Sequence, residues 1–200
     1  MSAPAAGPLA ALLEAEGRLN ALGPLPFPLP LGRTAPVVAG AFTGMGRGDW
    51  AVTGPRERVG AVLRGCGVER LLDPAAGARP YKLLPVSAAP GNRALHAVGL
   101  AIQCGSPVLC MLGLASAASG ALHEALNSAA LTGARVVFVL TVMELGDDAP
   151  IGPQLAASPA ALAAAYGLPA EVVEGTVEAV AAAVSAARLR STASLIVARI

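Results

Sequence analysis

The sequence is short of charged and aromatic side chains, which make up 14% and 3% of its 200 residues. The net charge is +1 at pH 7, and Lys82 is the single lysine among the 14 basic residues. This balance gives no electrostatic surface for nucleic acid or for an anionic membrane. Hydrophobic residues make up 54% of the chain, which is too many for an intrinsically disordered protein.

Cysteine pairs and long apolar runs are also missing. Cys66, Cys104 and Cys110 are an odd number without Cys-x-x-Cys spacing, so we expect neither a disulfide framework nor a zinc site. Charges and Gly or Pro interrupt every apolar stretch before about 18 residues, so we expect no transmembrane helix. Residues 1–18 lack the basic flank of a signal peptide. We therefore predict a cytoplasmic protein that buries part of its surface against another chain.

The first half of the chain has little periodicity. Residues 8–18 are expected to form a short helix, and the Pro-rich segment 23–32 an extended arm or a plain linker. Residues 36–93 are expected to be irregular, apart from short helices at 56–65 and 67–72. We expect residues 1–35 to form an N-terminal helix and arm, and residues 36–200 to form one domain.

The second half alternates between helical and strand patterns. We expect helices at 94–105, 119–133, 159–166 and 177–190, and strands at 107–113, 134–142, 170–175 and 194–200. This alternation predicts a doubly wound, mostly parallel α/β sheet with helices on both faces. Ligands in such sheets bind at the carboxyl ends of strands, here at residues 113–120, 143–152 and 175–176.

The loops at these strand ends carry little recognisable chemistry. Residues 113–120 contain neither a Gly-Lys-Ser/Thr phosphate loop nor Gly-x-Gly-x-x-Gly, and offer only the hydroxyls of Ser116 and Ser119. The next loop contains three carboxylates, which could hold a divalent cation or form a solvated acidic loop: Glu144, Asp147 and Asp148. His96 and His123 are expected to be structural, because no nucleophile–base pair can be assigned.

Several segments together resemble a known family. The stretch LCMLGLASAASGALHEALNSAALTGARVVFVL (109–140) resembles the thiamine-diphosphate-binding stretch of the alpha subunit of 2-oxo acid dehydrogenases, such as pyruvate dehydrogenase. Upstream, HAVGLAI (96–102) is similar to the helix before that motif, and residues 163–200 follow the family's final helices and strands. In the first half, GDWAVTGPRER (48–58) is similar to a family segment that contains an arginine, here Arg56. The resemblance implies the thiamine-diphosphate-binding fold.

The resemblance also implies that the cofactor motif has degenerated. In the family a Gly-Asp-Gly motif and a later Asn hold the Mg²⁺ that bridges the two phosphates. Here Gly113 keeps the first glycine, but Leu114 and Ala115 stand at the Asp and the second Gly, and Met143 at the Asn. Leucine and methionine cannot coordinate Mg²⁺, which requires oxygen ligands. A diphosphate without its counter-ion beside an apolar surface is costly.

We therefore predict a non-catalytic relative that is not an enzyme by itself. It would act as a structural or regulatory subunit, as a homo-oligomer or with a partner that resembles the dehydrogenase beta subunit. The small residues in 94–105 and 119–132 permit close packing between helices. We expect no cofactor at the degenerate site, whose residues are Gly113, Leu114, Ala115, Ser116 and Met143, with Arg56 as a further candidate.

Two alternatives remain open from the sequence. The first is an active thiamine-diphosphate-dependent dehydrogenase subunit, an oxidoreductase, with Mg²⁺ held by Glu144, Asp147 or Asp148. The second is a small-molecule-binding domain that uses the same crevice for a less charged ligand. Its lining would be Leu114, Ser116, Ser119 and Met143.

Overall fold

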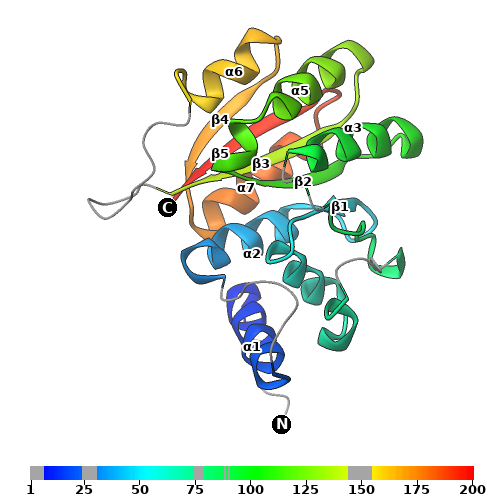
Figure 1. Cartoon of the computed structure of the whole chain (residues 1–200), viewed down its shortest axis with the longest axis vertical. Helices are drawn as coiled ribbons and strands as arrows, with labels where there is room; N and C mark the ends of the chain where they lie inside the picture. Colours follow the sequence, from blue (N-terminus) through cyan, green and yellow to red (C-terminus); the bar gives the residue numbers. More distant parts are fainter. Residues whose placement is uncertain (1–6, 24–30, 74–78, 88, 90, 144–154) are drawn as a thin grey trace.

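The computed structural model describes residues 7–23, 31–73, 79–87, 89, 91–143 and 155–200 (Figure 1). Its centre is a five-stranded parallel sheet with the strand order β1-β2-β3-β5-β4. The strands are β1 (Trp50–Val52), β2 (Val108–Gly113), β3 (Val136–Val142), β4 (Ala170–Glu174) and β5 (Ser194–Arg199). The predicted doubly wound parallel sheet is confirmed.

Helices cover both faces of this sheet (Figure 1). The α-helices are α1 (Pro8–Ala21), α2 (Ala35–Gly44), α3 (Asn92–Cys104), α4 (Leu114–Ala117), α5 (Gly120–Thr132), α6 (Pro159–Ala165) and α7 (Val177–Arg188). Short 3₁₀ helices are η1 (Gly32–Thr34), η2 (Glu57–Arg64), η3 (Val68–Leu71) and η4 (Arg79–Tyr81). No helix among the described residues has both the length and the hydropathy needed to cross a bilayer.

The strands divide the interior into two hydrophobic cores. Leu109 and Met111 of β2 face a first core with α1, α2 and α7, whereas Cys110 and Leu112 face a second core with α3, α5 and α6. Successive strand residues point to opposite faces, so a strand buried on both sides needs an unbroken apolar run. This explains why β2, β3 and β5 lack polar alternation.

The connections bring the carboxyl ends of the strands to one edge. The chain passes from β1 to β2 to β3 with α3 and α5 on the second-core face, and reaches β4 through α6 on that face. It then reverses direction to β5, with α7 on the opposite face, as right-handed crossovers require. Such a reversal creates the crevice in which doubly wound sheets bind ligands.

The four helices predicted for the second half of the sequence are present, with ends within two residues of those predicted, and three of them are capped as expected. Ser158 accepts a hydrogen bond from the Ala161 N–H at the start of α6, and Thr176 does the same for Ala179 in α7. Gly133 ends α5 in the left-handed conformation, with φ of 66°.

The prediction that residues 36–93 are largely irregular is wrong at two places. Helix α2 gives no amphipathic period in the sequence, because eight of its ten residues are buried. Strand β1 has only three residues, too few for a recognisable pattern. The expected short helices at 56–65 and 67–72 are present as η2 and η3. Most of the Pro-rich segment, residues 24–30, lies outside the described residues.

Helices α2 and α7 are in unusually close contact because two glycines face α7. A Cβ at Gly40 would lie 2.7 Å from the carbonyl oxygen of Val177 and 2.8 Å from the Cβ of Val180. A Cβ at Gly44 would lie equally close to Ala181 and Val184. Because glycine has no side chain, Gly40 and Gly44 allow these two helices to lie this close together.

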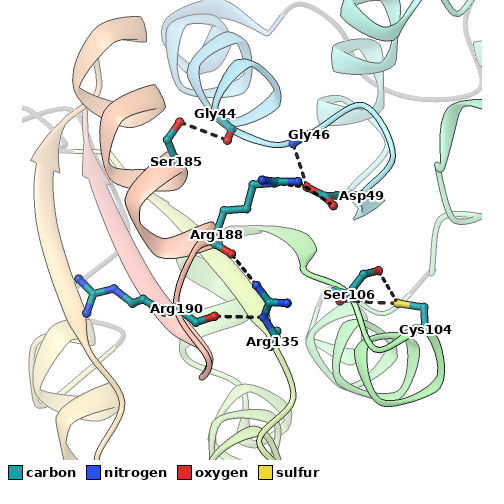
Figure 2. Close-up of polar contacts among 9 residues, drawn as sticks. All are labelled: Gly44, Gly46, Asp49, Cys104, Ser106, Arg135, Ser185, Arg188 and Arg190. Atoms are coloured by element: carbon teal, nitrogen blue, oxygen red, sulfur yellow. Dashed lines mark hydrogen bonds and ion pairs between the residues drawn. The ribbon is translucent and has the colours of Figure 1, made fainter.

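A polar network at the opposite, amino edge of the sheet ties α7 to the rest of the fold (Figure 2). The Asp49 carboxylate accepts hydrogen bonds from Arg188 and, at 2.8 Å, from the backbone N–H of Gly46. Arg135 donates to the carbonyl oxygens of Arg188 and Arg190 at 3.0 and 3.1 Å, and so satisfies the end of α7.

Candidate functional site

The loop after β2, which the resemblance assigns to the diphosphate, satisfies its own polar groups. Gly113 is extended, and the chain then turns into the four-residue helix α4. Ser116 is buried, and its carbonyl oxygen accepts a hydrogen bond from the Ser119 hydroxyl at 2.7 Å. Ser119 therefore directs its hydroxyl into the turn, as a tight packed loop would.

The two positions of the expected metal ligands lie at the same edge of the sheet. Gly113 pairs in register with Thr141, so Leu114 and Met143 both follow closely on the ends of neighbouring strands. Leu114 is half-buried and packs against the second core, whereas Met143 is 41% exposed. Ala115, between them in the motif, is exposed. This part of the sheet edge presents methyl and thioether groups.

The remaining sequence candidates are spread around this edge. Arg56 is exposed beside the carboxyl end of β1, immediately before η2. Glu144, Asp147 and Asp148 lie outside the described residues. Within the part of the chain that is described, no three His, Cys, Asp or Glu side chains form a group that could hold a metal ion.

Two further arginines, both in η2, are buried inside the protein. Arg58 has no exposed surface, and burial lowers its pKa while the carboxylate of Asp73 opposes that change. Arg64 donates to the Tyr81 carbonyl oxygen at 3.1 Å and stacks over Phe42; its burial lowers its pKa to about 10.

An ion pair at the ends of β1 and β2 was missed from the sequence. Arg93, in the first turn of α3, donates to the Met111 carbonyl oxygen at 3.3 Å and lies 3.8 Å from Glu57 Oε2. A Cβ added at Gly54 would collide with the charged ends of both the Arg93 and the Glu57 side chains. An arginine in a first helical turn opposes the helix dipole. That unfavourable placement was the available sign that Arg93 has a specific partner.

Both groups of this ion pair are largely shielded from solvent. The Arg93 side chain is 8% exposed and the Glu57 side chain 23%. Behind them, Cys110 lies in the second core, and burial raises the pKa of its thiol to about 12. The cation nearest to β2 is thus already engaged by protein groups.

Two cavities at the carboxyl edge lie away from this loop, around β4 and β5. One of about 380 Å³ is lined by residues 7–9, Pro36 and 175–178. The other, of about 500 Å³, is lined by Arg33, Glu174, Arg199 and Ile200. Residues 113–120 contribute to neither lining.

These observations test whether the described residues fit a diphosphate bridged by Mg²⁺. The ion requires octahedral oxygen ligands from the protein, the phosphates and water. Leu114 packs against the second core, Met143 ends in a thioether, and the Ser119 hydroxyl donates within the loop. The donor set of the described residues does not fit the metal-bridged group.

The architecture is that of the thiamine-diphosphate-binding fold, by its likeness to solved structures. Among solved structures, a transketolase from Campylobacter jejuni subsp. jejuni NCTC 11168 is similar over 96% of this chain, with a TM-score of 0.71 and 15% identity. Benzoylformate decarboxylase from Polynucleobacter necessarius is similar over 86% of the chain, with a TM-score of 0.58 and 17% identity. A putative thiamin diphosphate-dependent enzyme from Mycobacterium smegmatis is similar over 83%, with a TM-score of 0.58 and 17% identity.

These likenesses concern the fold and only part of each protein. The chain covers 37%, 34% and 31% of the three structures, about a third of their length. No family model matches the sequence, and no curated protein does. The similarity thus supports the thiamine-diphosphate-binding fold and leaves the resemblance to the dehydrogenase alpha subunit as a hypothesis.

Proposed function

We propose that this protein is a non-catalytic relative of thiamine-diphosphate-dependent enzymes that acts as a structural or regulatory subunit. It would do so in a homo-oligomer or beside a partner similar to the dehydrogenase beta subunit. The observation that carries the proposal is the placement of Leu114. At the position that the resemblance aligns with the metal-binding aspartate, this half-buried side chain packs against the second core.

The surrounding geometry supports the same conclusion. A crevice that binds a diphosphate needs cations or a metal to offset at least two negative charges. Arg93 is held by Glu57 and by a backbone carbonyl, and Arg58 is buried under other elements. Arg56 is exposed near the loop after β2, whereas the exposed Arg33 and Arg199 line the cavity around β4 and β5.

Small-molecule binding is the weaker candidate. A less charged ligand would depend on the Ser116 and Ser119 hydroxyls, but Ser116 is buried and the Ser119 hydroxyl donates its proton to the Ser116 carbonyl oxygen. Only the acceptor lone pairs of Ser119 then remain for such a ligand.

Restoring the metal ligands tests the proposal. The double variant Leu114→Asp, Met143→Asn supplies two oxygen ligands and should gain Mg²⁺-dependent binding of thiamine diphosphate, measured by calorimetry. The matched control is Leu114→Ala, Met143→Ala, which removes the same apolar groups without adding oxygens and should stay inert. Both variants lose packing of Leu114, so their thermal unfolding is measured alongside.

If the double variant folds but gains no binding, the alignment of Leu114 and Met143 with the metal ligands is wrong. If the unmodified protein already binds as tightly as the double variant, the non-catalytic assignment is wrong.

A further inference from the structure

The first turns of three helices surround one cavity at the carboxyl edge of the sheet. Helices α1, α2 and α7 all contribute to the first core, and α2 and α7 lie side by side (Figure 1). The cavity, of about 380 Å³, lies where these three helices begin. Its walls include four half-buried apolar side chains, and we call it the apolar cavity: Pro8, Leu9, Pro36 and Val177.

The apolar cavity offers few hydrogen-bond donors, although helix starts normally leave backbone N–H groups unpaired. Pro8 and Pro36 carry no N–H, and the Ala179 N–H donates to the Thr176 hydroxyl at 3.2 Å. Glu178, in the first turn of α7, adds an exposed carboxylate to the lining. The apolar cavity therefore suits a hydrocarbon group better than an anion.

A second cavity adjoins the first and is polar. It has a volume of about 500 Å³ and is lined by Arg33, Glu174, Arg199 and Ile200; we call it the polar cavity. Glu174 lines the polar cavity, and the next residue, Gly175, lines the apolar one. A Cβ at Gly175 would collide with Ile200 Cγ2 and lie 2.8 Å from the Arg199 carbonyl oxygen. The two cavities are therefore neighbours at a glycine where a side chain would not fit.

The side chains of the polar cavity have an excess of one positive charge. Arg33, Glu174 and Arg199 are all exposed. Within the described part of the chain, the Arg33 guanidinium makes no hydrogen bond or ion pair, so a ligand can bind it without displacing an internal partner. A guanidinium binds a carboxylate through two parallel hydrogen bonds. One excess positive charge complements a singly charged carboxylate better than a doubly charged phosphate.

We propose that the two cavities together bind a small amphipathic carboxylate. Its head pairs with Arg33 in the polar cavity, with the charge of Arg199 nearby, and its hydrocarbon chain lies against Leu9 in the apolar cavity. Each volume falls within the range of about 300–1,000 Å³ that ligand pockets have. Residues 113–120 line neither cavity, so this site is separate from the loop after β2 and does not rest on the proposed function.

Nuclear magnetic resonance titration of the ¹⁵N-labelled full chain with straight-chain carboxylates tests the proposal. The dissociation constant should fall at least about tenfold from butanoate to octanoate, because each fully buried CH₂ contributes about fourfold and this cavity is partly open. The amide signals of Gly175 and Thr176 should shift and saturate. Octan-1-ol, which has the same chain without the charge, should bind at least about fivefold more weakly than octanoate.

Variants at the head position separate the charge from the chain. Arg33→Gln should weaken butanoate and octanoate by the same factor, at least about fivefold, because only the head contacts Arg33. The matched control is Arg47→Gln: Arg47 is also exposed and lines neither cavity, so both dissociation constants should stay unchanged.

Variants along α1 test the position of the chain. Leu9→Gln should reduce the gain from butanoate to octanoate and leave the binding of butanoate unchanged. Leu13→Gln, at a side chain that is 49% exposed and lines neither cavity, should change neither. The same spectra show whether each variant is folded. Should Leu9→Gln unfold, the exposed Arg33 still carries the test.

Octanoate that shows no saturable binding overturns the proposal. Binding that is insensitive to Arg33→Gln overturns it as well, because the head then lies elsewhere. A clear preference for octyl phosphate over octanoate does the same, because the site would then select a doubly charged head. Calorimetry with thiamine diphosphate reports on the proposed function alone, so binding of that cofactor would contradict the non-catalytic role and leave the carboxylate site standing.

Discussion

Adding one methyl group at Gly40 should destabilise the protein, although the same change stabilises most helices. In Gly40→Ala the new Cβ would lie 2.7 Å from the Val177 carbonyl oxygen and 2.8 Å from the Val180 Cβ. Val177 and Val180 lie in the first turn of α7. The carbonyl oxygen is a backbone atom and the Cβ is bonded directly to the backbone, so neither can move away as the end of a flexible side chain could. Overpacking of this kind costs about 1–3 kcal/mol, while alanine gains about 0.8–1 kcal/mol in a helix interior.

The matched control separates these two effects. Gly17 is a helical glycine on the exposed side of α1, with nothing within 4 Å of the position that a Cβ would occupy. Gly17→Ala should therefore show the gain alone, about 0.5–1 kcal/mol. The difference between the two variants in urea unfolding gives the overpacking cost at the α2–α7 contact, expected near ~2 kcal/mol. If Gly40→Ala is stabilised as much as Gly17→Ala, the close α2–α7 contact is wrong.

Two further predictions concern charge and thiols. Asp49→Asn should lower the free energy of unfolding by about 1–3 kcal/mol, because Asp49 is 6% exposed and bonds Arg188 and Gly46. Glu69→Gln, in an exposed pair with Arg18, should change it by less than about 0.5 kcal/mol, and equal effects would contradict the role of the Asp49 network. In the native protein a thiol reagent should modify Cys104 and leave buried Cys66 and Cys110 unreacted until unfolding. Because burial raises the pKa of Cys110 to about 12, the unfolded chain ionises first, so stability is full below about pH 8.5 and falls above it. Cys110→Ala should flatten that decline between about pH 9 and 11, and an unchanged slope would show that another group causes it.

The sequence was sufficient for the parts of the fold whose residues carry local signals. Ser158 and Thr176 mark the starts of α6 and α7, and the unbroken apolar runs mark β2, β3 and β5. Helix α2 gave no such signal, because its burial on nearly all sides removes the polar face by which helices are recognised.

The site shows the same limit more sharply. The positions of Leu114 and Met143 followed from the resemblance, and the sheet register places them on neighbouring strand ends. The packing of Leu114 against the second core and the pairing of Arg93 with Glu57 depend on contacts between segments far apart in the chain. The spacing of residues along the sequence does not predict which distant segments will be in contact.

The most direct test of the central claim is a calorimetric titration of the unmodified protein with thiamine diphosphate, with and without Mg²⁺. If Leu114 and Met143 have removed the metal site, no saturable heat should appear up to about 1 mM cofactor in either condition. Saturable binding in the micromolar range that requires Mg²⁺ would contradict the account.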